Sequence, residues 1–449
     1  MTKDLTEGKP LPLILGFAFP ALLGYLFQQF YSVVDTLIVG KSLGVEALAA
    51  VGSTGAVNFL IIGFCMGLCG GFSIPVAQKF GAKDYRTMRQ YVVNSGYLSI
   101  VFAIVMTILT VIFCRPILEM MLTPADIIDD AVAYIRIIFW GIPLIILYNM
   151  VSSIIRALGD SRTPVLFLIL ASLLNIGLDL FFILVLGLGV AGAALATVIS
   201  QGVSGIACFV FMLHKFDVLV FSIDDKKLRP YHFKTLCGVG VPMGLQYSIT
   251  AIGSVILQAS VNSLGSGAVA AVTAASRISM FFCTPFDSLG TTMATYGGQN
   301  TGANKLERLK SGVGGSSVIG LVYSIFAFLV MLRFGDKLSL LFLDVTEQTI
   351  VAEAHQFLVT ISAFYFPLAL INILRFMIQG MGYSRFAIFS GIFEMVARIL
   401  VALFAVPVWG FSAVCYASPF AWILADMFLI PAFFACYRRL ERKLNRIPE

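Results

Sequence analysis

The residues of this chain that could do chemistry are carboxylates placed inside apolar stretches. Asp35 lies within "QQFYSVVDTLIVG" (residues 28–40), and a charge held in hydrocarbon costs about 3 kcal/mol or more. Asp179 lies in a second apolar stretch, and Asn175 precedes it by four residues, so the two share one helix face. Thr197 lies in a third apolar stretch. Together these side chains offer the oxygen donors that suit Na⁺, or two carboxyl groups that share a proton.

The elements that carry these residues are predicted to be membrane-spanning helices. The 449 residues are 59% hydrophobic and 12% charged, with a mean hydropathy of +0.94, whereas a soluble chain needs far more polar surface. Apolar stretches of roughly 20–27 residues recur, without strand-like alternation, and are long enough to cross a bilayer as helices. We therefore predict an all-α polytopic membrane protein with twelve transmembrane helices. The predicted spans cover residues 13–40, 50–77, 91–113, 131–155, 163–184, 189–212, 236–262, 271–296, 312–332, 353–378, 386–406 and 410–436.

The distribution of basic residues predicts the orientation of the chain. With both termini in the cytoplasm, the inside segments hold 22 Lys and Arg, the outside segments hold four, and four more fall within spans. This follows the positive-inside rule and predicts a multi-pass protein of the plasma (inner) membrane with both termini cytoplasmic. The start of the chain lacks the features of a cleavable signal. The basic tail "YRRLERKLNR" predicts contact with anionic lipid, and the net charge of +6 does not indicate nucleic acid.

The two halves of the chain resemble each other at a period near 222 residues. The matched pairs are Pro20 and Pro242, "AQKFGAKD" (77–84) and "GQNTGANK" (298–305), Pro143 and Pro367, "GDSR" (159–162) and "GYSR" (382–385), and "GVAGAALA" (189–196) and "GFSAVCYA" (410–417). Each half has six predicted spans, an even number, so the repeats run parallel through the membrane. This pattern predicts two parallel-repeat six-helix bundles with a central cleft.

The predicted domains follow from this repeat. Residues 1–212 form an N-terminal six-helix bundle, residues 213–235 a polar cytoplasmic linker, and residues 236–449 a C-terminal six-helix bundle with the basic tail.

The motifs "GFSIPVAQKFGAKDYRTMRQYV" and "RALGDSRTPVLFLILASLLNIGLDLFFI" resemble those of the multidrug and toxic compound extrusion (MATE) family, and the resemblance covers essentially the whole chain. The resemblance implies a V-shaped pair of six-helix bundles. It also implies export of organic, often cationic and aromatic, compounds coupled to Na⁺ or H⁺ entry. In that family an acid in the first span and an Asn–Asp pair in the fifth are associated with ion coupling. These positions match Asp35, Asn175 and Asp179.

We therefore expect a cation-coupled antiporter that exports amphipathic, cationic organic compounds, including drugs, by alternating access. Counted from the outer ends of their spans at 1.5 Å per residue, four polar groups fall within roughly 10 Å of depth. This predicts one site for Na⁺ or H⁺, formed by Asp35, Asn175, Asp179 and Thr197. The candidates for a substrate cavity are Gln28, Tyr31, Asn149 and Met150. We expect a monomer in contact with membrane lipid and small organic substrates, with no cofactor besides the coupling ion.

The second half is expected to differ from the first in chemistry. Its polar candidates are Asp287, Arg375, Glu394 and Arg398. Glu394 and Arg398 replace the Asn–Asp pair at the same spacing of four, which favours an intrahelical ion pair. The position that matches Asp35 is apolar, Ile256 or Leu257. Arg375 lies near the inner end of its span, where it could snorkel to the interface, and Asp426 is interpreted as structural.

Two other functions fit the sequence less well. A flippase for a lipid-linked precursor would present several cations to a pyrophosphate, whereas the first-half site offers carboxylates. An intramembrane enzyme could use Asp35 and Asp179 as acid and base, but the sequence lacks a Ser-His pair, a metal-binding histidine motif or a Gly-x-Gly-Asp context. The eight cysteines also lack metal-ligand or redox spacing. We therefore expect no catalytic residues and no enzymatic activity.

Overall fold

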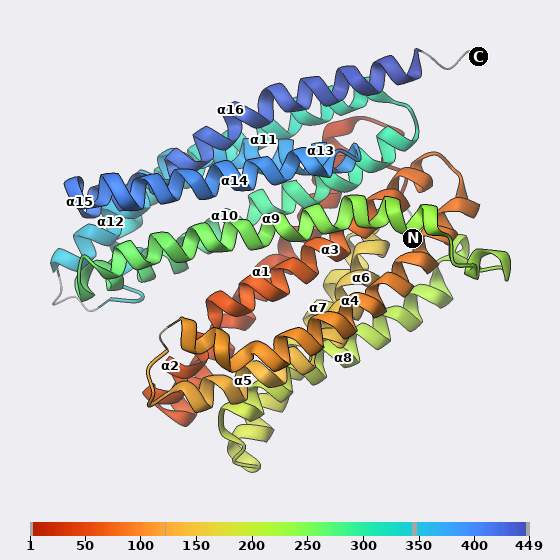
Figure 1. The fold of residues 1–449 in the computed structure, drawn as a ribbon. Helices are drawn as coiled ribbons and strands as arrows, with labels where there is room; N and C mark the ends of the chain where they lie inside the picture. Colours follow the sequence, from red (N-terminus) through yellow and green to blue (C-terminus); the bar gives the residue numbers. More distant parts are fainter. Residues whose placement is uncertain (1–2, 122, 344–347, 446–449) are drawn as a thin grey trace. The chain divides into compact units, whose positions relative to one another are not determined.

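The computed structural model describes residues 3–121, 123–343 and 348–445, and within these ranges the regular structure is entirely helical (Figure 1). Arg446, in the predicted basic tail, lies outside the described residues. The helices in chain order are α1 (Pro10–Leu43), α2 (Val45–Ser53), α3 (Gly55–Gly81), α4 (Tyr85–Met120), α5 (Ile128–Trp140), α6 (Ile142–Ala157), α7 (Arg162–Leu180), α8 (Gly189–Lys215), α9 (Pro230–Asn262), α10 (Ser266–Gly302), α11 (Leu306–Ser339), α12 (Gln348–Ala363), α13 (Tyr365–Gly380), α14 (Ser384–Leu400), α15 (Val406–Trp409) and α16 (Phe411–Leu444). Short π-helical segments, Phe181–Val185 and Val401–Ala405, follow α7 and α14.

The length and composition of the helices fit a membrane-spanning protein. Among the described residues, ten helical segments are long and apolar enough to cross a bilayer, and the number is twelve when each of two bent pairs counts as one span. The bent pairs are α5–α6 and α12–α13, and each bends by 48°. Pro143 and Pro367 follow the two breaks. Proline lacks an amide donor and its ring clashes with the preceding turn, which explains the bends.

The internal repeat predicted from the motifs is visible in the backbone. Four pairs of matched positions adopt positive φ angles in both halves: Gly44 and Gly265, Lys83 and Asn304, Gly159 and Gly382, and Gly189 and Gly410. Lys83 and Asn304 both have φ of 57°, which is uncommon for a residue with a side chain. The bent pairs and the π-helical segments also recur in matching places. The two halves therefore share one fold.

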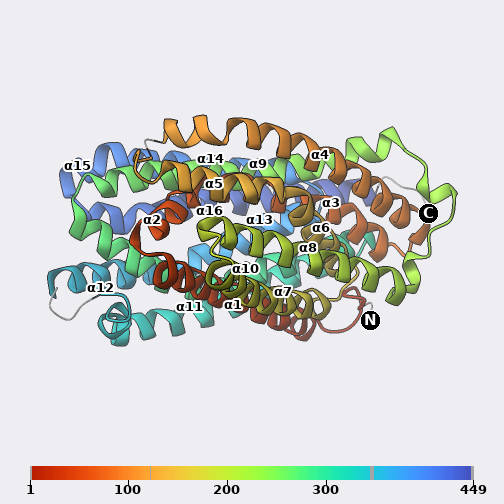
Figure 2. The ribbon, with the colours of Figure 1, turned by 90° about the horizontal axis from the view of Figure 1, so that it is seen from below.

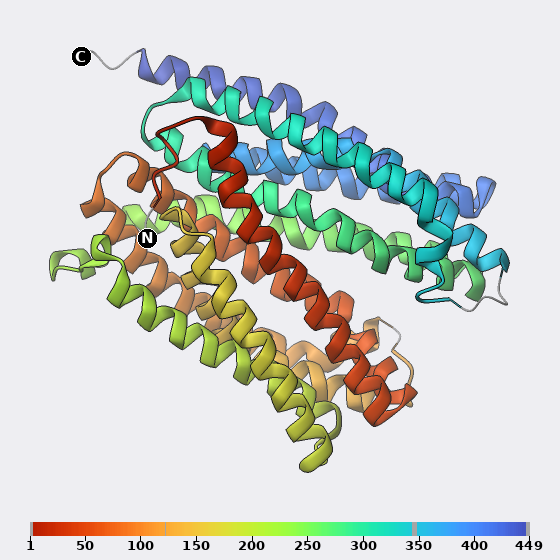
Figure 3. The same cartoon turned by 180° about the vertical axis from the view of Figure 1, so that it is seen from behind.

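The chain divides into two compact units, each with its own buried apolar core. Unit 1 contains residues up to Asp4 and Leu23–Gly244, and unit 2 contains Leu5–Leu22 and the chain from Leu245. In unit 1, α4 packs beside α5 (Figure 2) and α7 lies along α8 (Figure 3, yellow and yellow-green). In unit 2, α14 packs along α16 (Figure 1). The unit boundaries fall inside α1 and α9, not in the segment 213–235 as the sequence suggests.

The polar segment 213–235, predicted to be a linker, is fixed to α4 of unit 1. Asp225 is fully buried and accepts hydrogen bonds from Arg89 Nε at 2.9 Å and from the amide of Ser222 at 3.0 Å. Asn94 Oδ1 accepts a hydrogen bond from the amide of Arg229 at 3.0 Å. These bonds satisfy polar groups of an otherwise irregular segment, so it is a docked part of unit 1.

The charges of this segment favour docking at neutral pH. Hydrogen bonds and ion pairs from Lys227 and Arg86 lower the pKa of Asp224 to about 2. Burial raises the pKa of Asp225, but hydrogen bonds from Ser222 and Arg89 outweigh it, so the pKa is lowered. Groups with lowered pKa values contribute stability above their ordinary pKa, about 3.9 for Asp, and lose it as the pH falls through the folded value.

In unit 2, the "GQNTGANK" motif binds the segment that precedes α1. Gln299 Oε1 accepts a hydrogen bond from the amide of Leu5 at 2.9 Å, and Asn300 Nδ2 donates to the carbonyl of Leu5 at 3.3 Å. Lys305 Nζ donates to the carbonyl of Thr6 at 2.9 Å. The motif that reveals the repeat therefore has a structural role, because it holds an irregular segment in place.

Removal of the Asp225 charge tests the docking of segment 213–235. Asp225→Asn and Arg89→Gln each break a buried, charge-assisted hydrogen bond and should destabilise the protein by about 1.5–3 kcal/mol. The measurement is the melting temperature of the purified protein by size exclusion after heating. Asp217→Asn, at an exposed position of the same segment, is the control and should leave the melting temperature unchanged. Equal melting temperatures for all three variants and the wild type would show that the segment is not held by these bonds.

Candidate functional site

The four residues predicted to form one ion site converge in unit 1. Asp35 comes from α1, Asn175 and Asp179 from α7, and Thr197 from α8. Asn175 Nδ2 donates a hydrogen bond to Thr197 Oγ1 at 3.3 Å. The carboxyl groups of Asp35 and Asp179 lie next to each other, within range of a direct interaction. The structure thus brings together three helices whose polar residues are far apart in the sequence.

Local features of α7 and α8 place the site. The spacing of four puts Asn175 and Asp179 on one face of α7, and both are buried. Thr197 Oγ1 also donates to the carbonyl of Ala193, one turn earlier in α8, at 3.1 Å, which fixes its orientation. Gly192 lets α8 approach the end of α7, because a Cβ there would lie 3.1 Å from Phe182. The small residues at the start of α8 therefore bring Thr197 close to Asn175.

Several oxygen atoms of this site have no partner. Among the described residues, no hydrogen bond reaches Asp35 Oδ1, Asn175 Oδ1 or either carboxyl oxygen of Asp179. Asp179 is fully buried and Asn175 is 1% exposed. A buried polar atom left unsatisfied costs about 1–3 kcal/mol, and more when it is charged. The two carboxyl groups lie side by side, and Asn175 lies one turn before Asp179 on the same face of α7, so one bound cation, or a shared proton on the carboxyl pair, would help to satisfy these atoms.

Two tyrosines border the carboxyl pair. Tyr31, a predicted cavity residue, places its hydroxyl 3.4 Å from Thr197 Oγ1. Tyr134 of α5 is buried and lies within electrostatic range of Asp35, Asp179 and Tyr31. Sequence reasoning missed Tyr134, although its depth, three residues from the outer end of the predicted span 131–155, was an available signal.

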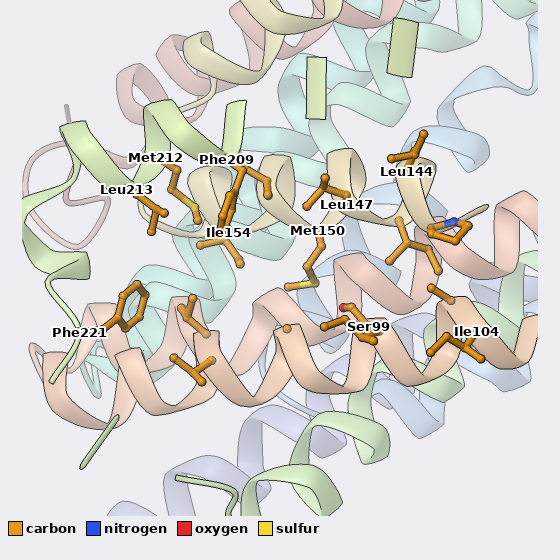
Figure 4. A pocket seen from close by; sticks show the side chains of 18 residues that line it. Ser99, Ile104, Leu144, Leu147, Met150, Ile154, Phe209, Met212, Leu213 and Phe221 are labelled. Carbon is orange, nitrogen blue, oxygen red and sulfur yellow. The ribbon is translucent and has the colours of Figure 1, made fainter. Parts of the chain in front are cut away.

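The other predicted cavity residues do not join this site. Gln28 is exposed, and Asn149 Nδ2 donates to the carbonyl of Ile145 in its own helix at 2.8 Å. Met150 is buried and lines a separate cavity of about 630 Å³ between α4, α6 and α8. Its side chain and those of Phe209 and Ser99 face this space, which is walled almost entirely by apolar groups (Figure 4). The predicted group of four cavity residues is therefore not a single feature of the described structure.

In unit 2, a buried ion-pair network links α13 and α14. Arg398 Nη2 donates to Glu394 Oε2 at 3.4 Å, which confirms the expected intrahelical pair. The guanidinium group of Arg375 also binds Glu394, and its Nε donates to Ser390 Oγ at 3.0 Å. Arg375 is only 7% exposed. The expectation that Arg375 snorkels is therefore wrong, because the carboxylate of Glu394 pairs with it inside the bundle.

Two further acids of the predicted spans in unit 2, Asp287 and Asp426, lie near this network. Asp426 is buried, and its Oδ1 has no hydrogen-bond partner among the described residues. Asp287, on α10, is exposed. Both lie within electrostatic range of Arg375.

The register of the two halves changes along this span, because α7 has 19 residues and α14 has 17. Counted from Gly159 and Gly382, Arg398 matches Asn175. Counted back from the π-helical segments, Phe181–Val185 and Val401–Ala405, Arg398 lies beside the position of Asp179, as the sequence predicts. Both counts place Arg398 in the stretch of α14 that corresponds to Asn175–Asp179 of α7.

The donor set of the unit 1 site restricts the ion. Among the described residues, no three His, Cys, Asp or Glu side chains are grouped so that they could hold a metal ion. The site has two carboxyl groups, one amide and one hydroxyl, and the transition-metal ligands sulfur and imidazole are not part of it. These hard oxygen donors fit Na⁺ or a proton.

The chain contains two copies of one bundle of membrane helices, and one copy carries a candidate cation site. This is the architecture of a secondary transporter. The MatE family model matches residues 20–181 and 242–404, one match in each half. The chain belongs to the MatE family of multidrug and toxic compound extrusion (MATE) transporters, as its motifs suggest.

Known relatives agree with this assignment. The chain is 31% identical to the probable multidrug resistance protein YoeA of Bacillus subtilis, over 76% of this chain and 75% of that protein. It is 24% identical to a FAD transporter of Shewanella oneidensis, over 80% of each chain. A solved outward-facing multidrug resistance MATE transporter matches the fold with a TM-score of 0.90 and 25% identity, over 98% of this chain and 99% of that chain. The predicted all-α fold of twelve transmembrane helices is confirmed.

Glu394 should be essential for the stability of unit 2. Glu394→Gln leaves two buried guanidinium groups without a carboxylate, and breaking a buried pair costs about 3–5 kcal/mol. We expect a large loss of monodisperse protein by fluorescence-detected size exclusion. The control is Glu119→Gln, which removes an exposed pair with Arg115 at the same spacing, worth about 0–1 kcal/mol. Equal yields of folded protein for the two variants would contradict the role assigned to Glu394.

Proposed function

We propose that this protein is a cation-coupled antiporter that exports amphipathic, cationic organic compounds, drugs among them, by alternating access. The observation that carries the proposal is the adjacent carboxyl pair of Asp35, which is half-buried, and Asp179, which is buried. Among the described residues, Asp35 Oδ1 and both carboxyl oxygens of Asp179 lack hydrogen-bond partners. Membership of the MatE family and the multidrug resistance relative support the export of drugs.

The coupling ion is Na⁺ or H⁺. Na⁺ would take oxygens from Asp35, Asp179 and Asn175, with Thr197 beside them, and both carboxylates would be ionised while it is bound. With H⁺, the mutual repulsion of two adjacent carboxylates favours one shared proton, so the pair titrates as a unit. Either cation gains about 2.3 kcal/mol per 100 mV for each charge that moves fully across the membrane. This energy is available to drive export.

The pair also offers a means of coupling. When the cation leaves, two like charges from α1 and α7 face each other in a poorly hydrated site, and their repulsion disfavours the compact arrangement. When the cation binds, this repulsion is removed. A cation that stabilises one arrangement of α1 and α7 over another shifts the population between them, and this difference is what coupling requires.

The proposed substrate class follows from the negative charge of the carboxyl groups in this site. Carboxylates attract cations, which favours organic cations over the anionic flavin nucleotide that the name of the Shewanella relative implies.

We further propose that the protein is a monomer in the plasma (inner) membrane. Both termini are cytoplasmic in this proposal, because 22 of the basic residues lie on the predicted inner side and four on the outer side. It contacts lipid, does not bind nucleic acid, is not an enzyme, and uses no cofactor besides the coupling ion.

Removal of either carboxylate charge should uncouple transport. Asp35→Asn and Asp179→Asn keep the shape of the side chains but remove the charge that is exchanged for the cation. Each should abolish gradient-driven efflux of a cationic dye from proteoliposomes, with the protein still monodisperse. Thr36→Val is the matched control, because among the described residues its hydroxyl bonds to the carbonyl of Ser32 alone, in its own helix, and the variant should pump near the wild-type rate. Asn variants that pump at the wild-type rate with the same cation dependence would refute the site.

The gradient that drives transport identifies the ion. Proteoliposomes loaded with a cationic dye and exposed to an imposed Na⁺ or pH gradient should lose dye faster under one of the two gradients than under neither. A matched anionic dye should not respond, because the site attracts positive charge. Dye efflux that is equal with and without both gradients would contradict cation coupling, and a response confined to the anionic dye would contradict the substrate class.

A further inference from the structure

A second cavity, in unit 2, is lined by residues of α9, α10, α12, α14 and α16 and is open to the surface, since Met280 of its lining is exposed. Its volume is about 290 Å³, near the lower end of the roughly 300–1,000 Å³ typical of ligand pockets. Its polar wall includes Arg398, Ser276, Ser279 and Ser418. Leu257, Phe357 and Trp422 belong to its apolar wall. Among the described residues that line it, none is acidic.

Arg398 supplies an unused cationic donor to this cavity. The residue is only 7% exposed, and its Nη1 has no hydrogen-bond partner among the described residues. Its Nη2 bonds to Glu394 at a long 3.4 Å, and Glu394 is also bound by Arg375. One carboxylate therefore serves two guanidinium groups. A buried charged donor left unsatisfied is costly, and an acceptor held in the adjoining cavity would remove that cost.

The internal repeat makes this cavity the counterpart of the cation site. Leu257 lies fifteen residues after Pro242, as Asp35 does after Pro20. Ser418 lies eight residues after Gly410, as Thr197 does after Gly189, and Arg398 lies in the stretch of α14 that corresponds to Asn175–Asp179 of α7. The apolar side chain of Leu257 replaces the carboxylate of Asp35, and a guanidinium group lies in the stretch that carries an amide and a carboxylate in unit 1. The polarity of the site is thus reversed between the two units.

We propose that this cavity binds the oxyanion group, carboxylate or phosphate, of a small organic molecule. Arg398 would donate a charge-assisted hydrogen bond from Nη1, and Ser276 and Ser418, which line the same cavity, would supply hydroxyl groups as further donors. The apolar side of the cavity, with Phe357 and Trp422, suits a single aromatic or aliphatic ring. This site does not depend on the coupling role of Asp35 and Asp179, because it lies entirely within unit 2.

Binding can be measured on the purified full-length protein, without transport. Trp140→Phe and Trp409→Phe at two exposed positions leave Trp422 as the single tryptophan, and it lines the cavity. The probes are benzoate, its neutral isostere benzamide, the cation benzylammonium and inorganic phosphate. Saturable binding is measured by the fluorescence of Trp422 and by scintillation proximity with radiolabelled benzoate. We expect benzoate to bind at least tenfold more tightly than benzamide and benzylammonium.

The binding of phosphate and the binding of benzoate to variants test the proposed site. If phosphate binds more weakly than benzoate, the result supports an organic ligand. If phosphate binds tightly and benzoate does not bind, the proposal of an organic ligand is wrong. Arg398→Gln should weaken benzoate binding at least tenfold, Arg398→Lys less, and Ser418→Ala about threefold with the ion-pair network intact. The matched control is Arg277→Gln, which removes an exposed charge beside Ser276 but outside the cavity lining, and it should leave binding unchanged. No saturable binding of radiolabelled benzoate, or equal losses in the Arg277 and Arg398 variants, would overturn the proposal.

Discussion

The constraint on which the mechanism of this protein depends is the cost of two carboxyl groups placed side by side inside a membrane bundle. Asp35 of α1 and Asp179 of α7 lie side by side, and among the described residues Asp35 Oδ1 and both carboxyl oxygens of Asp179 find no donor. A group in this position must be neutralised by a proton, a metal ion or a cationic side chain, because hydrocarbon does not solvate charge. No cationic side chain among the described residues is hydrogen-bonded or ion-paired to these oxygens, which is why we propose an exchangeable cation as their partner.

The two units share one backbone fold but carry different charged side chains in their interiors. The bent pairs, the π-helical segments and the positive-φ positions recur in both halves, so backbone geometry is shared. The polar residues diverge within that geometry, since Arg398 lies in the stretch of α14 that corresponds to Asn175–Asp179, and Leu257 stands where unit 1 has Asp35. Substitution of interior side chains leaves the packing of small residues and prolines intact, which is why the repeat remains detectable while the chemistry differs.

Much of the fold and part of the site could be predicted from the sequence. Asp35, Asn175, Asp179 and Thr197 were predicted to meet because the rise per residue of a helix fixes depth within a span. Depth does not reveal which faces of different helices meet, so the binding of Arg375 to Glu394 was missed. The assignment of residues 5–22 to unit 2 was missed for a similar reason, because α1 is one continuous helix and no turn or composition change marks the boundary.

The contrast between the two buried clusters separates a structural role from a functional one. In unit 2, Glu394 receives hydrogen bonds from both Arg375 and Arg398, so its charge is compensated by side chains that cannot leave. In unit 1, the carboxyl pair has no such partner among the residues that the structure describes. A permanently compensated cluster stabilises one packing arrangement, whereas a cluster that needs a mobile cation changes its electrostatic energy each time the cation enters or leaves. Only the second kind can link the conformation of the helices to an ion gradient. For this reason we propose coupling in unit 1 and assign the unused donor of Arg398 to a ligand of opposite charge.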